Sequence, residues 1–307
     1  MRRAIVTGAN AGVGRYTALG LAKQSFHVIL ACRSTARGEE AAEWIRSLEP
    51  AASVETMALD LANFNSVLDF AGRIEEQGPL HVLVLNAGIG GMGLVPEATA
   101  EGADLLYKVN FVSQFLLLLK LEASLRQGAA ARVVCLSSVM HRFGDATDWH
   151  PPIFYSPARN TYGTSKLAMA VLASEISRRW GAYGISGVAV NPGAVNSDIW
   201  YRGTLASWQE SIVRPLFRAV FLTSQQGSAC SVAAATEARF EAPTVGVYLC
   251  PYRTPRSRPM PFELHGPFAG PRLCQPHPAT LDEGAGKSLW EVTSEHLSSN
   301  SMLSRAF

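Results

Sequence analysis

A tyrosine and a lysine lie four residues apart, at Tyr162 and Lys166. At this spacing the phenol and the ammonium group share one face of a helix. A free phenol has a pKa near ~10, and a nearby cation favours the phenolate and lowers that pKa. Such a pair can pass a proton to or from another molecule at neutral pH. The same spacing also occurs on ordinary amphipathic surface helices, so the neighbouring residues must decide between the two interpretations.

Several polar residues follow apolar, strand-like runs in the same part of the chain. Ser137 and Ser138 close one such run, and strand alternation directs only one of these two side chains into a cleft. The segment 86–88, Asn-Ala-Gly, follows an earlier run, and Asn110 lies in the helical stretch after it. Ligands of α/β folds bind at the carboxyl edge of the sheet, where these residues are expected to gather.

The first apolar run leads into a glycine-rich turn and then into a helix-like stretch. Glycines let the backbone turn tightly and approach a pyrophosphate, and the following helix directs its free N–H groups at the anion. The turn therefore predicts a dinucleotide site, although a plain strand-to-helix loop can contain the same glycines. The residues expected to contact the phosphates are Gly8, Asn10, Ala11, Gly12, Val13 and Gly14.

The end of the second apolar run indicates which dinucleotide is bound. NAD-binding folds commonly place a carboxylate here for the 2′-hydroxyl of the adenosine ribose, whereas this chain has Arg33 and Ser34, followed by Arg37. A guanidinium group can hold a 2′-phosphate through two hydrogen bonds. The sequence therefore favours NADP(H) over NAD(H), with these three residues near the 2′-phosphate. The alternative is that Arg33 is only a solvated loop charge.

The elements that must position these residues alternate between short β-type runs and longer helix-type stretches. The β-type runs are nearly continuous in apolar residues, as expected for strands covered on both faces. This pattern predicts an α/β fold, a single-domain Rossmann-type doubly wound parallel sheet with helices on both faces. The expected strands are 4–7, 27–32, 54–59, 81–85, 132–137, 185–191 and 246–250, and the expected helices are 12–23, 36–48, 63–76, 101–125, 161–181, 225–237 and 281–297.

Composition narrows the function classes further. The 307 residues include 27 basic and 25 acidic side chains and are 48% hydrophobic, which excludes a disordered chain, a coiled coil and a strongly basic nucleic-acid binder. The first residues do not have the pattern of a secretory signal, and the sequence contains no uninterrupted apolar span of ~20 residues. A soluble, cytoplasmic, non-secreted protein is therefore expected. An odd number of widely spaced cysteines without metal-ligand spacing predicts reduced thiols and no metal site; they are Cys32, Cys135, Cys230, Cys250 and Cys274.

Taken together, the order and spacing of these motifs resemble the short-chain dehydrogenase/reductase family over about residues 4–200. Within the family, the segments 31–34, 162–179 and 289–292 look like the retinol-dehydrogenase-like branch. The chain departs from the common pattern at Leu85 and at Ser197, where many relatives have Asn and Thr. The matching residues are Thr7, Gly8, Gly12, Gly14, Asp60, Asn86, Ala87, Gly88, Asn110, Ser138, Tyr162, Lys166, Pro192 and Gly193.

The resemblance implies a role for each matching residue. Tyr162 would exchange a proton with the substrate oxygen while hydride moves between substrate carbon and nicotinamide, and Ser138 would hold that oxygen. Lys166 would lower the pKa of Tyr162 and bind the nicotinamide ribose, and Asn110 would anchor a water linking Lys166 to solvent. Further contacts to the cofactor are expected from Asp60, Leu61, Asn86, Ala87, Gly88, Pro192, Gly193 and Val195. Asp60 has the alternative role of capping the helix near Asn63.

The resemblance also suggests how the chain is divided. Residues 1–250 would form the dinucleotide-binding domain, including the catalytic residues and a substrate lid at about 197–222. Eight of the 17 prolines lie in 251–278, so 251–307 is expected to be a Pro-rich coil and a C-terminal helix packed on the same domain. The longer segment between Ser138 and Tyr162 is expected to line the pocket, with His141 and His150 as polar loop residues rather than metal ligands.

The apolar composition of 199–222 suggests a hydrophobic alcohol or carbonyl as substrate, of the retinoid, steroid or lipid aldehyde class. Arg214 and Arg218 beside the apolar residues leave peripheral contact with a membrane surface open, although lid packing also explains the pattern. A homo-oligomer is equally left open. Two alternatives to an NADP(H)-dependent oxidoreductase remain, a catalytically weak NADP(H)-binding sensor or scaffold and a sugar-nucleotide epimerase.

Overall fold

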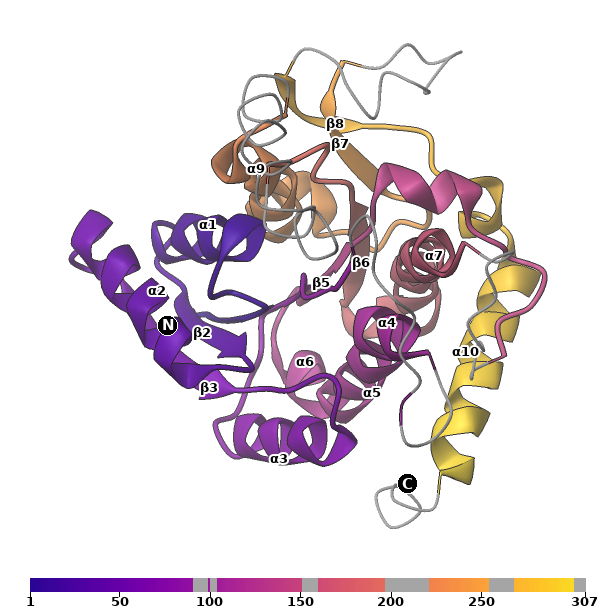
Figure 1. Cartoon of the computed structure of the whole chain (residues 1–307), viewed down its shortest axis with the longest axis horizontal. Helices are drawn as coiled ribbons and strands as arrows, with labels where there is room; N and C mark the ends of the chain where they lie inside the picture. Colours follow the sequence, from indigo (N-terminus) through magenta and orange to yellow (C-terminus); the bar gives the residue numbers. More distant parts are fainter. Residues whose placement is uncertain (91–98, 100–103, 151–159, 197–220, 254–267, 301–307) are drawn as a thin grey trace, which may run out of the picture.

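The computed structural model describes residues 1–90, 99, 104–150, 160–196, 221–253 and 268–300. In these residues one eight-stranded sheet has the order β3-β2-β1-β4-β5-β6-β7-β8 (Figure 1). Strands β1 to β7 pair in parallel, and β8 pairs antiparallel with β7 at the edge. The strands are β1 (Arg3–Thr7), β2 (His27–Cys32), β3 (Ser53–Ala58), β4 (Val82–Leu85), β5 (Arg132–Leu136), β6 (Ser186–Val190), β7 (Tyr248–Tyr252) and β8 (Phe268–Leu273).

Helices cover both faces of the sheet. Helices α1, α2 and α9 share one apolar cluster with the sheet, while α3, α5, α7 and α10 share the other. The longer helices are α1 (Gly12–Ala22), α2 (Thr35–Leu48), α3 (Phe64–Glu75), α5 (Ser113–Lys120), α6 (Glu122–Gln127), α7 (Thr161–Trp180), α9 (Ser224–Thr236) and α10 (Glu283–Ser299). Shorter helical turns are α4 (Leu105–Tyr107), η1 (Lys108–Val112), η2 (Val139–Phe143), η3 (Gly181–Tyr183), η5 (Ala238–Phe240) and η6 (Pro278–Thr280).

Alternation along the central strands builds the two halves of the core. In β1, Ile5 faces the cluster with α3, α5 and α7, while Ala4 and Val6 face the cluster with α1 and α9. Every residue of β4 and β5 is buried, because the sheet is covered on both sides. This burial confirms the α/β doubly wound fold that the continuous apolar runs predict.

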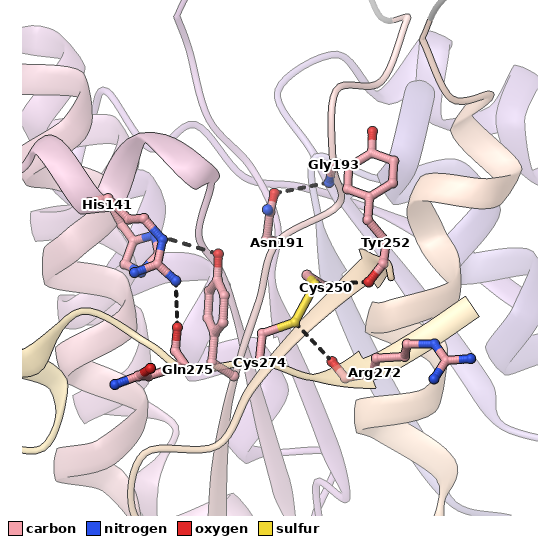
Figure 2. Close-up of a disulfide and its surroundings, with 10 residues drawn as sticks. His141, Asn191, Gly193, Cys250, Tyr252, Arg272, Cys274 and Gln275 are labelled. Carbon is pink, nitrogen blue, oxygen red and sulfur yellow. Dashed lines mark hydrogen bonds between the residues drawn. A yellow bond between two sulfur atoms is a disulfide. The ribbon is translucent and has the colours of Figure 1, made fainter. Parts of the chain in front are cut away.

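The C-terminal stretch differs from its prediction as a coil. Residues Phe268–Leu273 form β8, where Leu273 is paired with Leu249 of β7. This pairing brings Cys250 and Cys274 together in a disulfide (Figure 2). The prediction of reduced thiols is therefore wrong for this pair, because a separation of 24 residues in sequence does not reveal an antiparallel neighbour.

Several expectations concern residues outside the described ranges. Most of the expected lid, together with Ser197, Arg214 and Arg218, belongs to 197–220, and part of the expected pocket wall belongs to 151–159. In the residues that are described, no helix has the length and apolarity needed to cross a membrane. The C-terminal helix predicted at 281–297 is present as α10.

Candidate active site

Polar residues, most of them predicted from the sequence, gather at the carboxyl ends of four neighbouring strands. Thr7 ends β1, Asn86 follows β4, Ser137 follows β5, and Asn191 follows β6. These strands are adjacent in the sheet, and the order reverses between β1 and β4, because β2 and β3 extend the other way. Open α/β sheets bind ligands at such a switch point. The fold therefore creates a common edge for residues from distant parts of the chain.

The glycine turn between β1 and α1 has the backbone that its sequence requires. Gly8 and Gly12 have φ of 67° and 55°, in the left-handed region that favours glycine. A Cβ on Gly14 would lie 2.5 Å from the Gly8 carbonyl oxygen. Among the described residues, no side chain caps the amino end of α1, and its first turn has no acidic residue. The backbone N–H groups in the first turn of α1 therefore remain available to bind a pyrophosphate.

Thr7 connects the glycine turn to the segment after β4. Its Oγ1 accepts hydrogen bonds of 2.9 Å from the backbone N–H groups of Asn86 and Ala87. The same hydroxyl lies 3.1 Å from Oε1 of Gln114, whose Nε2 donates to the Ala87 carbonyl at 3.0 Å. In return, Nδ2 of Asn86 donates to the Thr7 carbonyl at 2.7 Å. Gln114 is fully buried, and a glutamine in an apolar helix belongs to no motif from which this role could be predicted.

Asn110 lies where the predicted helix 101–125 changes its winding. The structure has a π-helical turn, η1, around Asn110, and the helix is interrupted again between α5 and α6. The side chain of Asn110 accepts a hydrogen bond from Ile89 N–H at 2.7 Å and donates to the Ile89 carbonyl at 2.9 Å. Asn110 thus holds the segment after β4. A π turn often marks a functional site, and the water-anchoring role stays a prediction.

The two serines after β5 point in different directions. Ser137 is buried, and its hydroxyl donates to the Lys166 carbonyl of α7 at 2.8 Å. Ser138 caps η2 by accepting from the Met140 N–H, and its side chain lies near enough to Tyr162 to influence the pKa of that phenol. Of the two alternatives, the structure brings Ser138 to the tyrosine and directs Ser137 into the scaffold.

Tyr162 and Lys166 share one face near the beginning of α7. Asn160 begins this helix, because its side chain accepts a hydrogen bond from the Gly163 N–H at 2.9 Å. The Nζ atom of Lys166 lies 5.7 Å from the centre of the Tyr162 ring and donates to the Leu136 carbonyl at 3.2 Å. A Cβ on Gly88 would lie 3.3 Å from the same Nζ. The pair therefore faces the Asn-Ala-Gly segment.

The environment shifts the pKa values of both groups. Burial raises the pKa of Tyr162, and the nearby Ser138 side chain acts in the opposite direction. Burial is the larger of these two effects, and the lowering by Lys166 stays a prediction. Burial also lowers the pKa of Lys166 to about 8. The phenol thus retains its proton at neutral pH, and the lysine remains mainly cationic there.

The Pro192-Gly193 turn after β6 is held close to the glycine turn. Gly193 has φ of 81°, and its N–H donates to the side chain of Asn191 at 2.9 Å (Figure 2). The next N–H, from Ala194, donates to the phenol oxygen of Tyr252 on β7 at 3.0 Å. Val195 packs with Tyr252 and with Val13 of the glycine turn. Tyr252, which no sequence motif marks, therefore supports this turn.

The residues expected at the adenosine end of the cofactor differ in their exposure and in their contacts. Arg33 and Arg37 are exposed beyond β2, and Ser34 caps α2. Asp60 accepts a hydrogen bond from the Ala62 N–H at 3.0 Å, while Asn63 rather than Asp60 caps α3. The side chain of Leu61 is buried in the core, which leaves only its backbone for a ligand. Asn10 and Ala11 lie half-buried in the glycine turn.

The two histidines after β5 also differ from each other. His150 is exposed and lies 2.7 Å from Asp148, as expected for a polar loop residue. His141 is fully buried, so its prediction as a polar loop residue is wrong. No group of three or more His, Cys, Asp or Glu side chains suited to a metal occurs in the described residues.

Comparison with known proteins identifies the family. The family model described as short chain dehydrogenase matches residues 2–204. The chain belongs to this family. Its members in the comparisons are dehydrogenases and reductases, so the chain is an oxidoreductase acting on CH–OH or C=O groups.

The curated relatives lie in the retinol-dehydrogenase-like part of the family. Dehydrogenase/reductase SDR family member 13 of Bos taurus is 35% identical over 296 residues, covering 95% of this chain and 72% of that protein. Retinol dehydrogenase 12 of Mus musculus is 35% identical over 232 residues, covering 75% of this chain and 72% of that protein. A solved short-chain dehydrogenase of Sphingobium yanoikuyae, in complex with NADPH, has a TM-score of 0.61 at 22% identity, covering 76% of this chain and 84% of that one.

Proposed function

We propose that this short-chain dehydrogenase uses NADP(H) to interconvert a hydrophobic alcohol and its carbonyl compound. The observation that carries the proposal is the placement of Tyr162 near both the Ser138 side chain and the buried Lys166 ammonium. This group lies at the sheet edge that also contains the glycine turn. A proton donor, an oxygen-binding hydroxyl and a dinucleotide site therefore occur at one edge.

The side chains suggest how a carbonyl is reduced. When bound, the nicotinamide dinucleotide supplies the hydride. Ser138 Oγ holds the carbonyl oxygen, and Tyr162 Oη gives that oxygen its proton. The raised pKa of Tyr162 keeps this proton in place before reaction, and the cationic Lys166 stabilises the phenolate that forms. In alcohol oxidation the same phenol oxygen receives the proton.

The substrate class rests on the apolar segment 199–222 and on the likeness to retinol dehydrogenase 12. Absorbance of NADPH, followed with a panel of apolar aldehydes and ketones beside small polar ones, tests it. We expect turnover of the apolar compounds. Turnover limited to small polar sugars or acids would contradict the substrate class, and NADPH binding without any turnover would favour the sensor alternative.

The cofactor preference is expected to depend on Arg33. Replacing Arg33 by Asp removes a guanidinium from the adenosine end and adds a charge that repels a 2′-phosphate. Loss of a charge-assisted hydrogen bond costs about 1.5–3 kcal/mol, so the affinity for NADPH should fall at least about tenfold. The affinity for NADH should change little. Titration of protein fluorescence with each cofactor measures both.

The matched control is Arg73→Asp. Arg73 is also exposed, but it lies in the last turn of α3, which leads to the amino end of β4 and not to the carboxyl ends of the strands. The same charge change there should leave the NADPH to NADH preference as it is. Equal losses in both variants would show that net charge, and not a 2′-phosphate site, sets the preference.

The pH dependence should follow Lys166. Its pKa of about 8 means that the side chain is charged below this pH and loses its charge as the pH rises through it. Stabilisation of the Tyr162 phenolate is lost with the charge. We therefore expect kcat/KM for carbonyl reduction to decline between about pH 7.5 and 9. Cofactor affinity measured across the same range separates binding from chemistry, and a flat profile would contradict this role of Lys166.

A further inference from the structure

His141 is a fully buried imidazole close to the proposed catalytic serine, and the mechanism above leaves it without a role. It lies in η2, three residues after Ser138. Its ring contacts Tyr248 of β7, with 4.7 Å between ring centres. A histidine in such a position needs partners for both ring nitrogens, because an unpaired buried polar atom is costly.

Both ring nitrogens have partners, and these partners determine the tautomer. The backbone N–H of His277 donates to Nε2 of His141, with 3.2 Å between the nitrogens. Because an N–H group can only donate, Nε2 must be the unprotonated acceptor and Nδ1 must carry the proton. Nδ1 lies 2.6 Å from the Ser138 carbonyl oxygen and therefore donates to it. The Tyr248 phenol oxygen lies 3.5 Å from the same Nδ1.

The charge state of His141 keeps this arrangement constant. Burial, with smaller effects from Arg142 and His277, lowers the pKa of His141 to about 3. The imidazole is therefore neutral at every pH at which the enzyme would be assayed, so one nitrogen always donates and the other always accepts.

The residue that donates to Nε2 of His141 belongs to residues 274–277, a C-terminal segment that is anchored to the sheet. Cys274 is joined to Cys250 on β7 by the disulfide, and its N–H donates to the Tyr248 carbonyl at 2.9 Å. The guanidinium of Arg142, the residue next to His141 in sequence, donates to the Gln275 carbonyl. A segment more than 130 residues away in sequence therefore packs beside the turn that contains Ser138.

We propose that His141 is a positioning residue, which transmits the fixed position of residues 274–277 to the backbone of Ser138. This inference rests on the proposed function, because it assumes that Ser138 binds the substrate oxygen. The Ser138 carbonyl also accepts the His141 backbone N–H at 3.0 Å, so the imidazole adds a second restraint on this carbonyl. An error of about 1 Å in the position of an oxygen-binding hydroxyl can cost about 10²-fold in rate.

Three substitutions of His141 separate its two hydrogen bonds. His141→Phe removes both, His141→Asn retains a donor near the position of Nδ1, and His141→Gln retains an acceptor near the position of Nε2. We expect kcat to fall about 10- to 100-fold in His141→Phe. The Asn variant should recover most of that loss and the Gln variant little, while the affinity for NADPH, measured by fluorescence, stays within about threefold.

Two substitutions at His277 test the hydrogen bond from its backbone N–H without changing the imidazole of His141. The backbone φ of His277 is −61°, which proline adopts. His277→Pro and His277→Ala both lose the side chain that accepts from the Ala279 N–H, but only the proline variant also loses the donor to His141. We expect kcat to be several-fold lower in the proline variant than in the alanine variant. Equal values would overturn the proposal even if His141→Phe does not fold.

Ser138→Ala in the same assay separates failure of this inference from failure of the proposed function. Full activity of Ser138→Ala would remove the role given to Ser138 itself. Loss of activity in Ser138→Ala, together with equal recovery by the Asn and Gln variants of His141, would overturn only the positioning role.

Discussion

Replacing Tyr162 by phenylalanine should lower the rate of turnover about 10²–10⁴-fold, the range associated with loss of one general acid or base. The change removes the phenol oxygen and leaves the ring, which packs on α7 beside Lys166. The change does not touch the glycine turn or the hydrogen bond from Met140 N–H to Ser138. NADPH absorbance with the best substrate of the panel measures the rate, and fluorescence titration should give an unchanged cofactor affinity.

Tyr183→Phe is the matched control for this substitution. Tyr183 lies in η3 at the other end of α7, is 49% exposed and has no part in the proposed site. Removing the phenol oxygen of Tyr183 should leave kcat unchanged. If Tyr162→Phe kept a rate within about threefold of the unsubstituted enzyme, Tyr162 could not be the proton donor.

Adding one methyl group at Gly14 should weaken both the fold and the cofactor site. The Cβ of Gly14→Ala would lie 2.5 Å from the Gly8 carbonyl oxygen and from Nδ2 of Asn86. Neither atom can retreat easily, because Gly8 is in a left-handed turn and Asn86 is bonded to Thr7. We expect a loss of about 1–3 kcal/mol in the free energy of unfolding. NADPH affinity should fall more than tenfold, since the turn and the amino end of α1 must separate.

The same substitution at Gly72 provides the control. Gly72 is exposed in α3, and among the described residues no atom lies within 4 Å of a Cβ placed there. Gly72→Ala should raise the free energy of unfolding by about 0.5–1 kcal/mol, because alanine favours helix more than glycine does. Urea unfolding and NADPH titration test both variants. An unchanged NADPH affinity in Gly14→Ala would show that the turn does not hold the phosphates as proposed.

Local patterns were sufficient for most of the scaffold. The apolar run at 27–32 predicts β2 without error, and the glycine turn predicts where α1 begins. The helical spacing of Tyr162 and Lys166 placed both side chains near the beginning of α7. Each of these conclusions depends on residues within a few positions of one another, and backbone preferences and side-chain spacing act over that range.

The features that the sequence did not reveal arise from contacts between distant segments. Nothing near Cys250 in sequence indicates that β8 returns beside β7 and brings Cys274 to it. Nothing near His141 indicates that the N–H of His277 meets its ring. The pKa of Tyr162 is raised because the assembled protein removes water from the phenol, which the spacing to Lys166 does not describe.

The sequence by itself indicated the family, the approximate positions of β1 to β7 along the chain and the pair Tyr162 and Lys166, since these depend on short-range spacing. Only the tertiary structure decided that Ser138 rather than Ser137 meets the tyrosine, that a π turn lets Asn110 hold Ile89, and that a C-terminal segment supports the serine turn. The physical reason is that hydrogen-bond partners and burial arise from packing between elements far apart in the chain.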